Sequence, residues 1–150
     1  MHFPVRVLFV CYRNATRSQI ATTLLRRLGG DRVEVYSAGI QPEPFDPLAI
    51  EVMADIGLDI SGQMSKSIEH FLYQEFDYII MLCDLSQAYV AEFPDAPIHL
   101  CWPLPDPAEF QGSPEDRRAL LQHMYVELTG RIRRWLSAIP EYQPLAGQCL

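Results

Sequence analysis

Short apolar runs alternate along this chain with stretches whose apolar residues recur every three or four positions. Four short runs lie between turn residues and predict strands, of which Asp77 to Cys83 is the clearest buried one. These runs are Val5 to Val10, Val33 to Ala38, Asp77 to Cys83 and Ile98 to Cys101. Runs that are apolar at successive positions are typical of strands buried on both faces of a sheet. The pattern therefore predicts an α/β fold with βαβ units and a parallel sheet that has helices on both faces.

The stretches between the strands carry helix signals at their ends. Ile20 opens the apolar positions of a first helix, and the pair Gly29-Gly30 closes it. Asp46-Pro47 and Ser113-Pro114 each place a capping residue before a first-turn proline, which predicts two more helix starts. We expect the helices to cover residues 20–28, 46–56, 68–72 with Ser65 as its cap, 85–92, and 113–137. Prolines 103, 105 and 107 predict an irregular loop before the last helix.

Composition and charge narrow the class of protein. The 150 residues are 49% hydrophobic and 21% charged, which is typical of a globular domain and excludes a disordered chain. We expect one domain over residues 1–150, with its core at about 5–138 and a loosely attached tail after 140. The formal charge of −7 gives no general attraction to nucleic acid or to an anionic membrane. Widely spaced cysteines, and the absence of a leader or of a long apolar run, favour a cytoplasmic protein with free thiols.

The loop that follows the first strand carries the clearest chemical signal. It reads CYRNATRS, so that five residues separate Cys11 from Arg17, and the first helix follows directly. A loop at a helix N-terminus can turn its N–H groups toward an anion, helped by the helix dipole. Arg17 can add a planar pair of donors for a tetrahedral oxyanion, and Cys11 beneath it would then be a thiolate nucleophile. Asn14 suits such a loop because asparagine tolerates left-handed turns.

Several motifs in the same order make the chain resemble a known family. They are the strand with CYRNATRSQ at 11–19, Ser37-Ala38-Gly39, GLDIS at 57–61, Leu82-Cys83, and Trp102 with Asp106-Pro107. Together they resemble the low-molecular-weight protein tyrosine phosphatase superfamily, and within it the thiol-dependent arsenate reductases. The resemblance implies a four-stranded parallel sheet in the order 2-1-3-4, with the anion loop at the carboxyl ends of the strands.

The resemblance also implies roles for individual residues. Cys11 would attack phosphorus or arsenic, Arg17 would hold the oxyanion, and Asp106 would protonate the leaving oxygen. An aspartate before a proline is also common in turns, which is the alternative interpretation of Asp106. The groups expected to bind the oxyanion are those of the loop: Tyr12, Arg13, Asn14, Ala15, Thr16, Arg17 and Ser18.

Reductase and phosphatase share the first step and differ in what removes the adduct from Cys11. Cys83 matches the position of the resolving thiol of the reductases, although a small residue closing a buried strand is the alternative. Gln19, where phosphatases commonly have proline, and Asp106-Pro107-Ala108, without a following aromatic pair, favour the reductase. Residues 84–93 contain no further cysteine, so the three-cysteine relay of the thioredoxin-coupled type is absent. Cys101 or an external thiol could complete the reaction instead.

Three hypotheses follow for the function. The first is an arsenate reductase without a tightly bound cofactor, supplied by glutathione and glutaredoxin, mycothiol or thioredoxin. The second is a low-molecular-weight phosphatase acting on phosphotyrosine or small phosphomonoesters, and the third is a non-catalytic module that binds an oxyanion or senses redox state. Some reductases hold a monovalent cation behind the loop with acidic side chains, but this chain aligns Thr22 and Lys66 there. We therefore expect no metal, and the Lys66 ammonium in the place of the cation.

Overall fold

The computed structural model describes residues 3–83 and 97–139, and its centre is one parallel sheet. The strands are β1 (Val5–Cys11), β2 (Val33–Gly39), β3 (Tyr78–Met81) and β4 (Ile98–Cys101). They lie in the order β2-β1-β3-β4, and every neighbouring pair is parallel. The predicted α/β class and strand order 2-1-3-4 are therefore confirmed.

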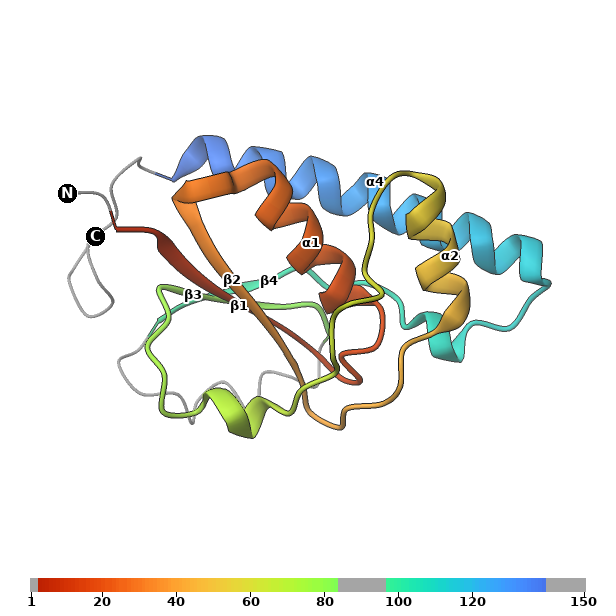
Figure 1. The fold of residues 1–150 in the computed structure, drawn as a ribbon, viewed down its shortest axis with the longest axis horizontal. Coiled ribbons are helices and arrows are strands. Elements are labelled where there is room, and N and C mark those ends of the chain that lie inside the picture. The colour runs from red at the N-terminus through yellow and green to blue at the C-terminus, as the bar shows by residue number, and fades with distance from the viewer. Residues whose placement is uncertain (1–2, 84–96, 140–150) are drawn as a thin grey trace.

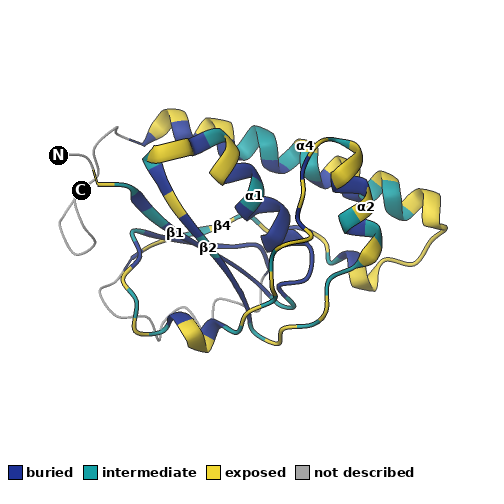
Figure 2. Ribbon diagram, in the orientation of Figure 1, coloured by how far each residue is buried: buried dark blue, intermediate teal, exposed yellow. Residues whose placement is uncertain are grey.

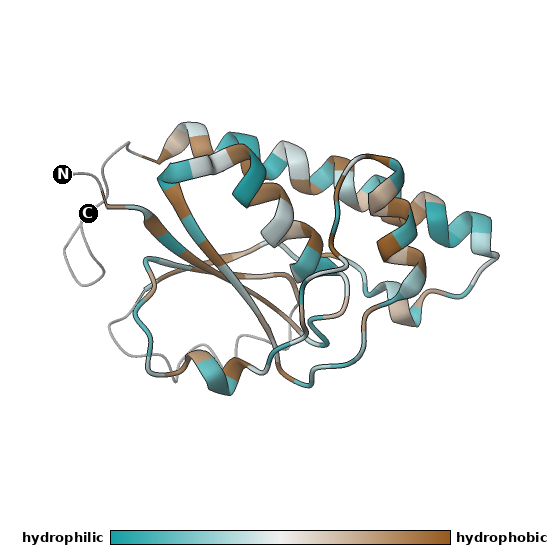
Figure 3. Cartoon of the chain, viewed as in Figure 1, coloured by the Kyte–Doolittle hydropathy of each residue, from teal (hydrophilic) through white to brown (hydrophobic). Residues whose placement is uncertain are grey.

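The two faces of the sheet are covered differently. Figure 1 shows α1 (Arg17–Gly29), α2 (Pro47–Asp55) and α4 (Pro114–Ala138) over one face, and the short helix η2 (Ile68–Phe71) on the other. A large apolar cluster joins β1 to the three long helices, and a smaller one joins β1 to η2. The central strands β1 and β3 are buried along nearly their whole length in Figure 2 and largely hydrophobic in Figure 3, which accounts for their apolar sequences. The edge strand β4 is mostly exposed.

The helix starts follow the capping signals of the sequence. The Asp46 side chain accepts the N–H of Leu48 at 3.0 Å and caps α2. Ser113 accepts the N–H of Asp116 at 3.0 Å and caps α4, which ends at Ala138. In both cases a first-turn proline gives up no hydrogen bond, because the first N–H groups of a helix have no partner within the helix. The helix α1 begins at Arg17, about one turn before its first expected apolar residue, and a short helix η1 (Gly30–Arg32) follows it.

Two local predictions need correction. Ser67, not Ser65, caps η2, because only the Ser67 side chain accepts the N–H of Glu69. The strand β3 ends at Met81, although the Leu82 N–H still donates to Val10, so the backbone leaves the ladder earlier than its apolar sequence suggests.

The proline-rich segment also holds one regular turn. A short helix, η4 (Pro107–Glu109), begins where the Asp106 side chain accepts the N–H of Ala108 at 2.9 Å. Two predicted features, the helix at 85–92 and the tail after 140, lie outside the described residues.

Within the part of the chain that the structure describes, no helix combines the length and the apolar character needed to cross a membrane.

The helix α4 supplies much of the larger cluster, and this gives a first test. Leu128 is fully buried, whereas Val126 on the same helix is 64% exposed. We expect Leu128→Ala to lower the free energy of unfolding by about 3 kcal/mol, because it leaves a cavity in the core. Urea denaturation measures this. Val126→Ala is the control and should cost less than about 0.5 kcal/mol; equal losses in both variants would contradict the packing described.

Candidate active site

A small polar pocket opens at the carboxyl edge of the sheet, between the loop after β1 and the start of η4. Its volume is about 70 Å³. The side chains around it come from β1, the loop, the segment before α2, the η4 region and α4. They are Cys11, Arg13, Ala15, Thr16, Arg17, Glu43, Pro44, Asp46, Asp106, Ala108 and Arg117. The carboxyl ends of parallel strands are where open α/β sheets place their ligands.

Cys11 lies at the base of this pocket as the last residue of β1, and it is 1% exposed. Its Sγ accepts the backbone N–H of Asn14 at 3.2 Å and lies 3.0 Å from the Ser18 Oγ. The Ser18 Oγ itself accepts from the Asn14 Nδ2 at 2.6 Å, so the serine hydrogen is available for the sulfur. These two contacts hold the Cys11 sulfur in a fixed position at the pocket.

Asn14 shapes the loop from inside the protein. It is fully buried and has a φ of 52°, in the left-handed region that the sequence predicted for it. Its Nδ2 also donates to the Ser37 Oγ on β2 at 3.0 Å, and its Oδ1 accepts the Lys66 N–H at 2.7 Å. One side chain therefore joins the loop to β2 and to the segment that follows α2.

The backbone carbonyl of Asn14 is held as firmly as its side chain. Gln19 on α1 donates its Nε2 to this oxygen at 2.8 Å, and Ser65 donates its hydroxyl at 3.0 Å. This is the role that Ser65 plays instead of capping η2. Sequence reasoning missed the Ser65 contact, because a hydrogen bond across 51 residues leaves no local pattern.

Gly39 allows the loop to pass close to the end of β2. A Cβ added there would lie 2.8 Å from the Asn14 Cβ and 2.9 Å from the Arg13 carbonyl carbon. The Gly39 N–H donates to the Lys66 carbonyl at 2.7 Å, so this point is fixed from the other side as well. Glycine is needed here for a close approach of two backbones.

Arg17 faces the pocket from the first residue of α1 and is 4% exposed. Its Nη1 donates to the Leu104 carbonyl at 3.3 Å, and its Nη2 lies 3.5 Å from the Asp106 Oδ2. Thr16, at the N-cap of the same helix, makes no side-chain capping bond, and the first turn has no acidic residue. An anion in the pocket would meet both the guanidinium and the positive end of the helix.

Asp106 is ionised in this arrangement. Partial burial raises the pKa of the carboxyl, but the Ala108 N–H and the charges of Arg17 and Arg13 outweigh burial and hold the pKa below its ordinary value. The Arg13 Nε lies 3.1 Å from the Asp106 Oδ2. The carboxylate thus occupies two arginines that an anionic ligand would otherwise meet.

Arg13, one of the groups expected to bind the oxyanion, is held in place by two carboxylates. Its Nη1 pairs with the Glu43 Oε1 at 2.7 Å, in addition to its contact with Asp106. The hydrogen bond to Glu43, followed by that to Asp106, raises the pKa of the guanidinium. Tyr12 contacts Gln41 through its hydroxyl at 2.6 Å and does not line the pocket.

The remaining pocket charges were not anticipated. Arg117 on α4 forms an ion pair with Asp46 and donates to the Pro107 carbonyl at 3.4 Å. Asp46 was interpreted only as a helix cap, a role that it keeps through Leu48. The partner of Asp46 lies 71 residues further along the chain, so only the folded structure brings the two together.

Cys83 and Cys101 lie along the same edge of the sheet but outside the pocket. The register places Val10, Met81 and Cys101 side by side on β1, β3 and β4. Cys83 follows β3 and is buried, whereas Cys101 is exposed and stands two strands from Cys11. Neither lines the pocket around Cys11. Cys149, expected in the tail, lies outside the described residues.

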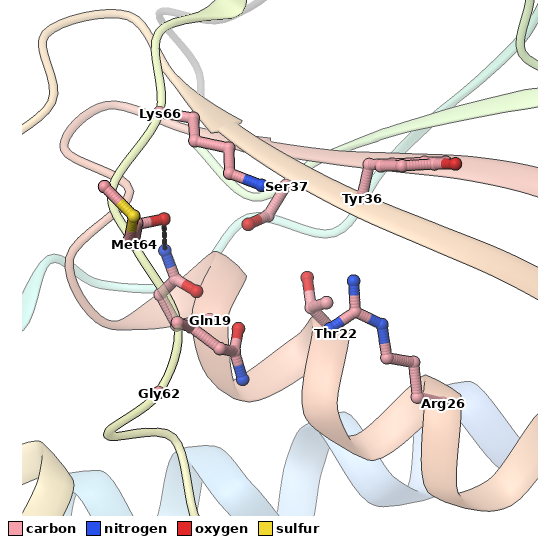
Figure 4. Close-up of a pocket in the computed structure, with 9 residues that line it drawn as sticks. Gln19, Thr22, Arg26, Tyr36, Ser37, Gly62, Met64 and Lys66 are labelled. Carbon is pink, nitrogen blue, oxygen red and sulfur yellow. Dashed lines mark hydrogen bonds between the residues drawn. The ribbon is translucent and has the colours of Figure 1, made fainter.

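A monovalent cation does not suit the space behind the loop. A second pocket there is bordered by Thr22 and Lys66, as the alignment predicted, but none of its lining residues is acidic (Figure 4). Elsewhere in the described ranges, no three His, Cys, Asp or Glu side chains gather as metal ligands. The Lys66 ammonium would repel a cation there, and no carboxylate in the lining offsets its charge.

Comparison with known proteins gives consistent matches over most of the chain. Residues 6–143 match the model of the low molecular weight phosphotyrosine protein phosphatase family. An arsenate reductase of Halalkalibacterium halodurans is 33% identical over 127 residues, which is 85% of this chain and 91% of that protein. A glutaredoxin arsenate reductase of Synechocystis sp. is 38% identical over 102 residues, or 68% and 78% of the two chains.

The solved structures agree. A structure described as an arsenate reductase in the phosphate binding state has a TM-score of 0.76 at 30% identity and covers 91% of this chain and 99% of that one. Its description places an oxyanion on a protein that shares this fold.

The close approach at Gly39 can be tested by a small substitution. We expect Gly39→Ala to weaken the binding of inorganic phosphate by about tenfold or more, because the new methyl group must displace Asn14 and the loop backbone. Titration calorimetry measures the affinity. Gly130→Ala on α4, where a Cβ meets only the flexible end of Arg134 at 3.3 Å, is the matched control and should bind as the wild type does. Unchanged affinity in both would contradict this role of Gly39.

The competition between Asp106 and an anion predicts a pH dependence. We expect Asp106→Asn to bind phosphate about tenfold more tightly at neutral pH, because Arg17 loses a competing carboxylate. The pKa of Asp106 lies below its ordinary value of 3.8, so the carboxylate stays charged above about pH 4. Bound phosphate raises the proton affinity of Asp106, so the ratio of the two affinities should be largest at about pH 8 and fall toward one as the pH is lowered to about 4. A ratio that stays the same from about pH 8 to about pH 4 would contradict the assignment.

Proposed function

The chain belongs to the low molecular weight phosphotyrosine protein phosphatase family, on its arsenate reductase branch, and we propose that it reduces arsenate to arsenite with Cys11 as the nucleophile. The observation that carries the proposal is the Cys11 thiol at the base of an anion pocket, with hydrogen-bond donors on its sulfur and Arg17 beside it. Relatives with this function cover nearly the whole chain.

In the first step the loop binds arsenate between the N-terminus of α1 and Arg17. The buried position of Arg17 fixes its donors, so the oxyanion is oriented with arsenic above the Cys11 sulfur. The thiolate electron pair forms a sulfur–arsenic bond, and one arsenate oxygen leaves. Ser18 and the Asn14 N–H hold the sulfur in position until this bond forms.

Asp106 supplies the proton for the leaving oxygen in this proposal. In the free protein it is ionised by its contacts with Arg17 and Arg13. An incoming oxyanion takes over Arg17 and brings negative charge next to the carboxylate, and both effects increase its affinity for a proton. Asp106 can then take a proton from one hydroxyl group of bound dihydrogen arsenate and pass it to the other hydroxyl group, which leaves as water.

A second thiol completes the reduction. Its thiolate attacks the Cys11 sulfur and forms a disulfide, while the electron pair of the sulfur–arsenic bond stays on arsenic and releases arsenite. Cys83 is the internal candidate, because it follows the strand next to β1. It does not line the pocket, so its attack requires the segment after β3 to move toward Cys11.

The external donor restores the thiols, and the names of two relatives support a thiol donor of the glutaredoxin or thioredoxin kind. A protein named glutaredoxin arsenate reductase is among them, which supports glutathione with glutaredoxin as the donor. Thioredoxin and mycothiol remain the other candidates expected from the sequence. The mechanism uses no tightly bound cofactor.

One observation favours phosphatase activity as a second candidate function. The pocket holds Cys11, Arg17 and Asp106 together, whereas Cys83 lies outside it. Water could therefore cleave a phosphocysteine formed on Cys11 without any second thiol. The family model that matches the chain is itself that of a phosphatase.

The two activities can be separated by replacing Cys83. We expect Cys83→Ser to abolish arsenite formation with glutaredoxin or thioredoxin as donor, and to leave hydrolysis of p-nitrophenyl phosphate unchanged. Steady-state assays of both reactions on the full chain measure this. Cys101→Ser is the matched control, because its thiol is exposed and two strands from Cys11.

The outcomes discriminate between the proposals. Loss of arsenite formation in Cys83→Ser alone identifies the resolving thiol. Loss in Cys101→Ser alone transfers that role to Cys101. Hydrolysis that is indifferent to both, with no arsenite from the wild type under any donor, would replace the reductase by the phosphatase.

A further inference from the structure

A second cavity of about 240 Å³ lies behind the anion loop, between α1, β2 and the segment at 62–66 (Figure 4). It shares no lining residue with the pocket around Cys11. Side chains of Gln19, Thr22 and Arg26 approach it from α1, and Ser37 and Lys66 approach it from the other side. This cavity has no part in the reaction described above.

The Gln19 amide leaves a buried acceptor at this cavity. Its Nε2 donates to the carbonyls of Asn14 at 2.8 Å and Met64 at 3.2 Å, so the orientation of the amide is fixed by two acceptors. The Oε1 must therefore point the other way, and Figure 4 shows it directed toward the cavity. Gln19 is 1% exposed, and its Oε1 has no hydrogen-bond partner among the described residues. A buried acceptor without a donor is costly and indicates a missing partner.

The charges at the cavity are positive. Lys66, the only lysine of the chain, extends toward Ser37 in Figure 4, and no ion pair in the described ranges involves it. Arg26 reaches the same cavity and uses one nitrogen for the Val35 carbonyl at 2.6 Å. The cavity lining contains no carboxylate that would neutralise either cation. Two cations without a carboxylate attract an anion.

We propose that this cavity is a second binding site, for a small oxyanion that carries a hydroxyl group, such as monohydrogen phosphate. The negative oxygens would pair with Lys66 and Arg26, and the hydroxyl would donate to the Gln19 Oε1. A fully deprotonated or spherical anion lacks that donor. The hydroxyls of Thr22 and Ser37 complete a polar lining.

The site is connected to the anion loop through two residues. Gln19 holds the Asn14 carbonyl, and Ser37 accepts a hydrogen bond from the Asn14 side chain. Because both hydrogen bonds are already made without an anion, binding in the cavity does not have to move the loop around Cys11. The proposal concerns binding and does not depend on which reaction Cys11 performs.

Titration of the ¹⁵N-labelled full chain with inorganic phosphate, at constant ionic strength, tests the proposal by nuclear magnetic resonance. The Gln19 side-chain amide and the Thr22 and Gly62 backbone amides report on the cavity, whereas Ala15 and Thr16 report on the anion loop. We expect the cavity signals to follow a dissociation constant of their own. Lys66→Gln and Arg26→Gln should each weaken that constant by about tenfold and leave the constant of the loop unchanged.

Arg27→Gln is the matched control. Arg27 neighbours Arg26 on α1 and also donates to a backbone carbonyl, that of Gly57, but it does not line the cavity. This variant should keep both constants. The proposal is overturned if the cavity signals do not move with phosphate, or if they follow the constant of the loop in every variant. The proposal is also overturned if the cavity signals respond to potassium chloride but not to inorganic phosphate added as its choline salt, because the cavity would then bind a cation.

Discussion

The site depends on the hydrogen bonds of one buried residue, Asn14. Its side chain makes hydrogen bonds with β2 and with the segment before η2, and its backbone oxygen accepts a hydrogen bond from α1. Its N–H donates to the Cys11 sulfur. An asparagine at a φ of 52° costs little, because its amide can satisfy the groups that such a turn exposes. Three separate parts of the chain thereby hold the anion loop in one conformation, which is the arrangement that anion binding needs before the anion arrives.

The charges of the pocket are balanced without a ligand. Asp106 and Glu43 pair with Arg13, and Asp106 also faces Arg17. An oxyanion must therefore exchange with a carboxylate rather than enter an empty positive site. In the proposed mechanism this exchange links binding to proton transfer, because the carboxylate that loses its arginine would be the one that carries the proton. Binding and acid catalysis would then be two results of one ion-pair rearrangement.

The sequence was sufficient for the sheet, the long helices and the Cys11 to Arg17 loop. Their signals are local: apolar periodicity, capping residues before proline, and a cysteine and arginine at a helix start. Contacts between distant segments gave no such signal, so the roles of Ser65 and Arg117 and the contact of Gln19 with Met64 were missed. Gln19 drew notice only as a difference from the phosphatases, although it holds the Asn14 carbonyl.

The most direct test of the account is a single turnover of the reduced full chain with arsenate and a limiting amount of glutathione. Arsenite is counted, and the disulfides are mapped by mass spectrometry of the peptides. The account predicts one disulfide that includes Cys11 for every arsenite released, with Cys83 or glutathione as the partner. Arsenite that appears while Cys11 remains a free thiol would contradict the central role of the Cys11 sulfur.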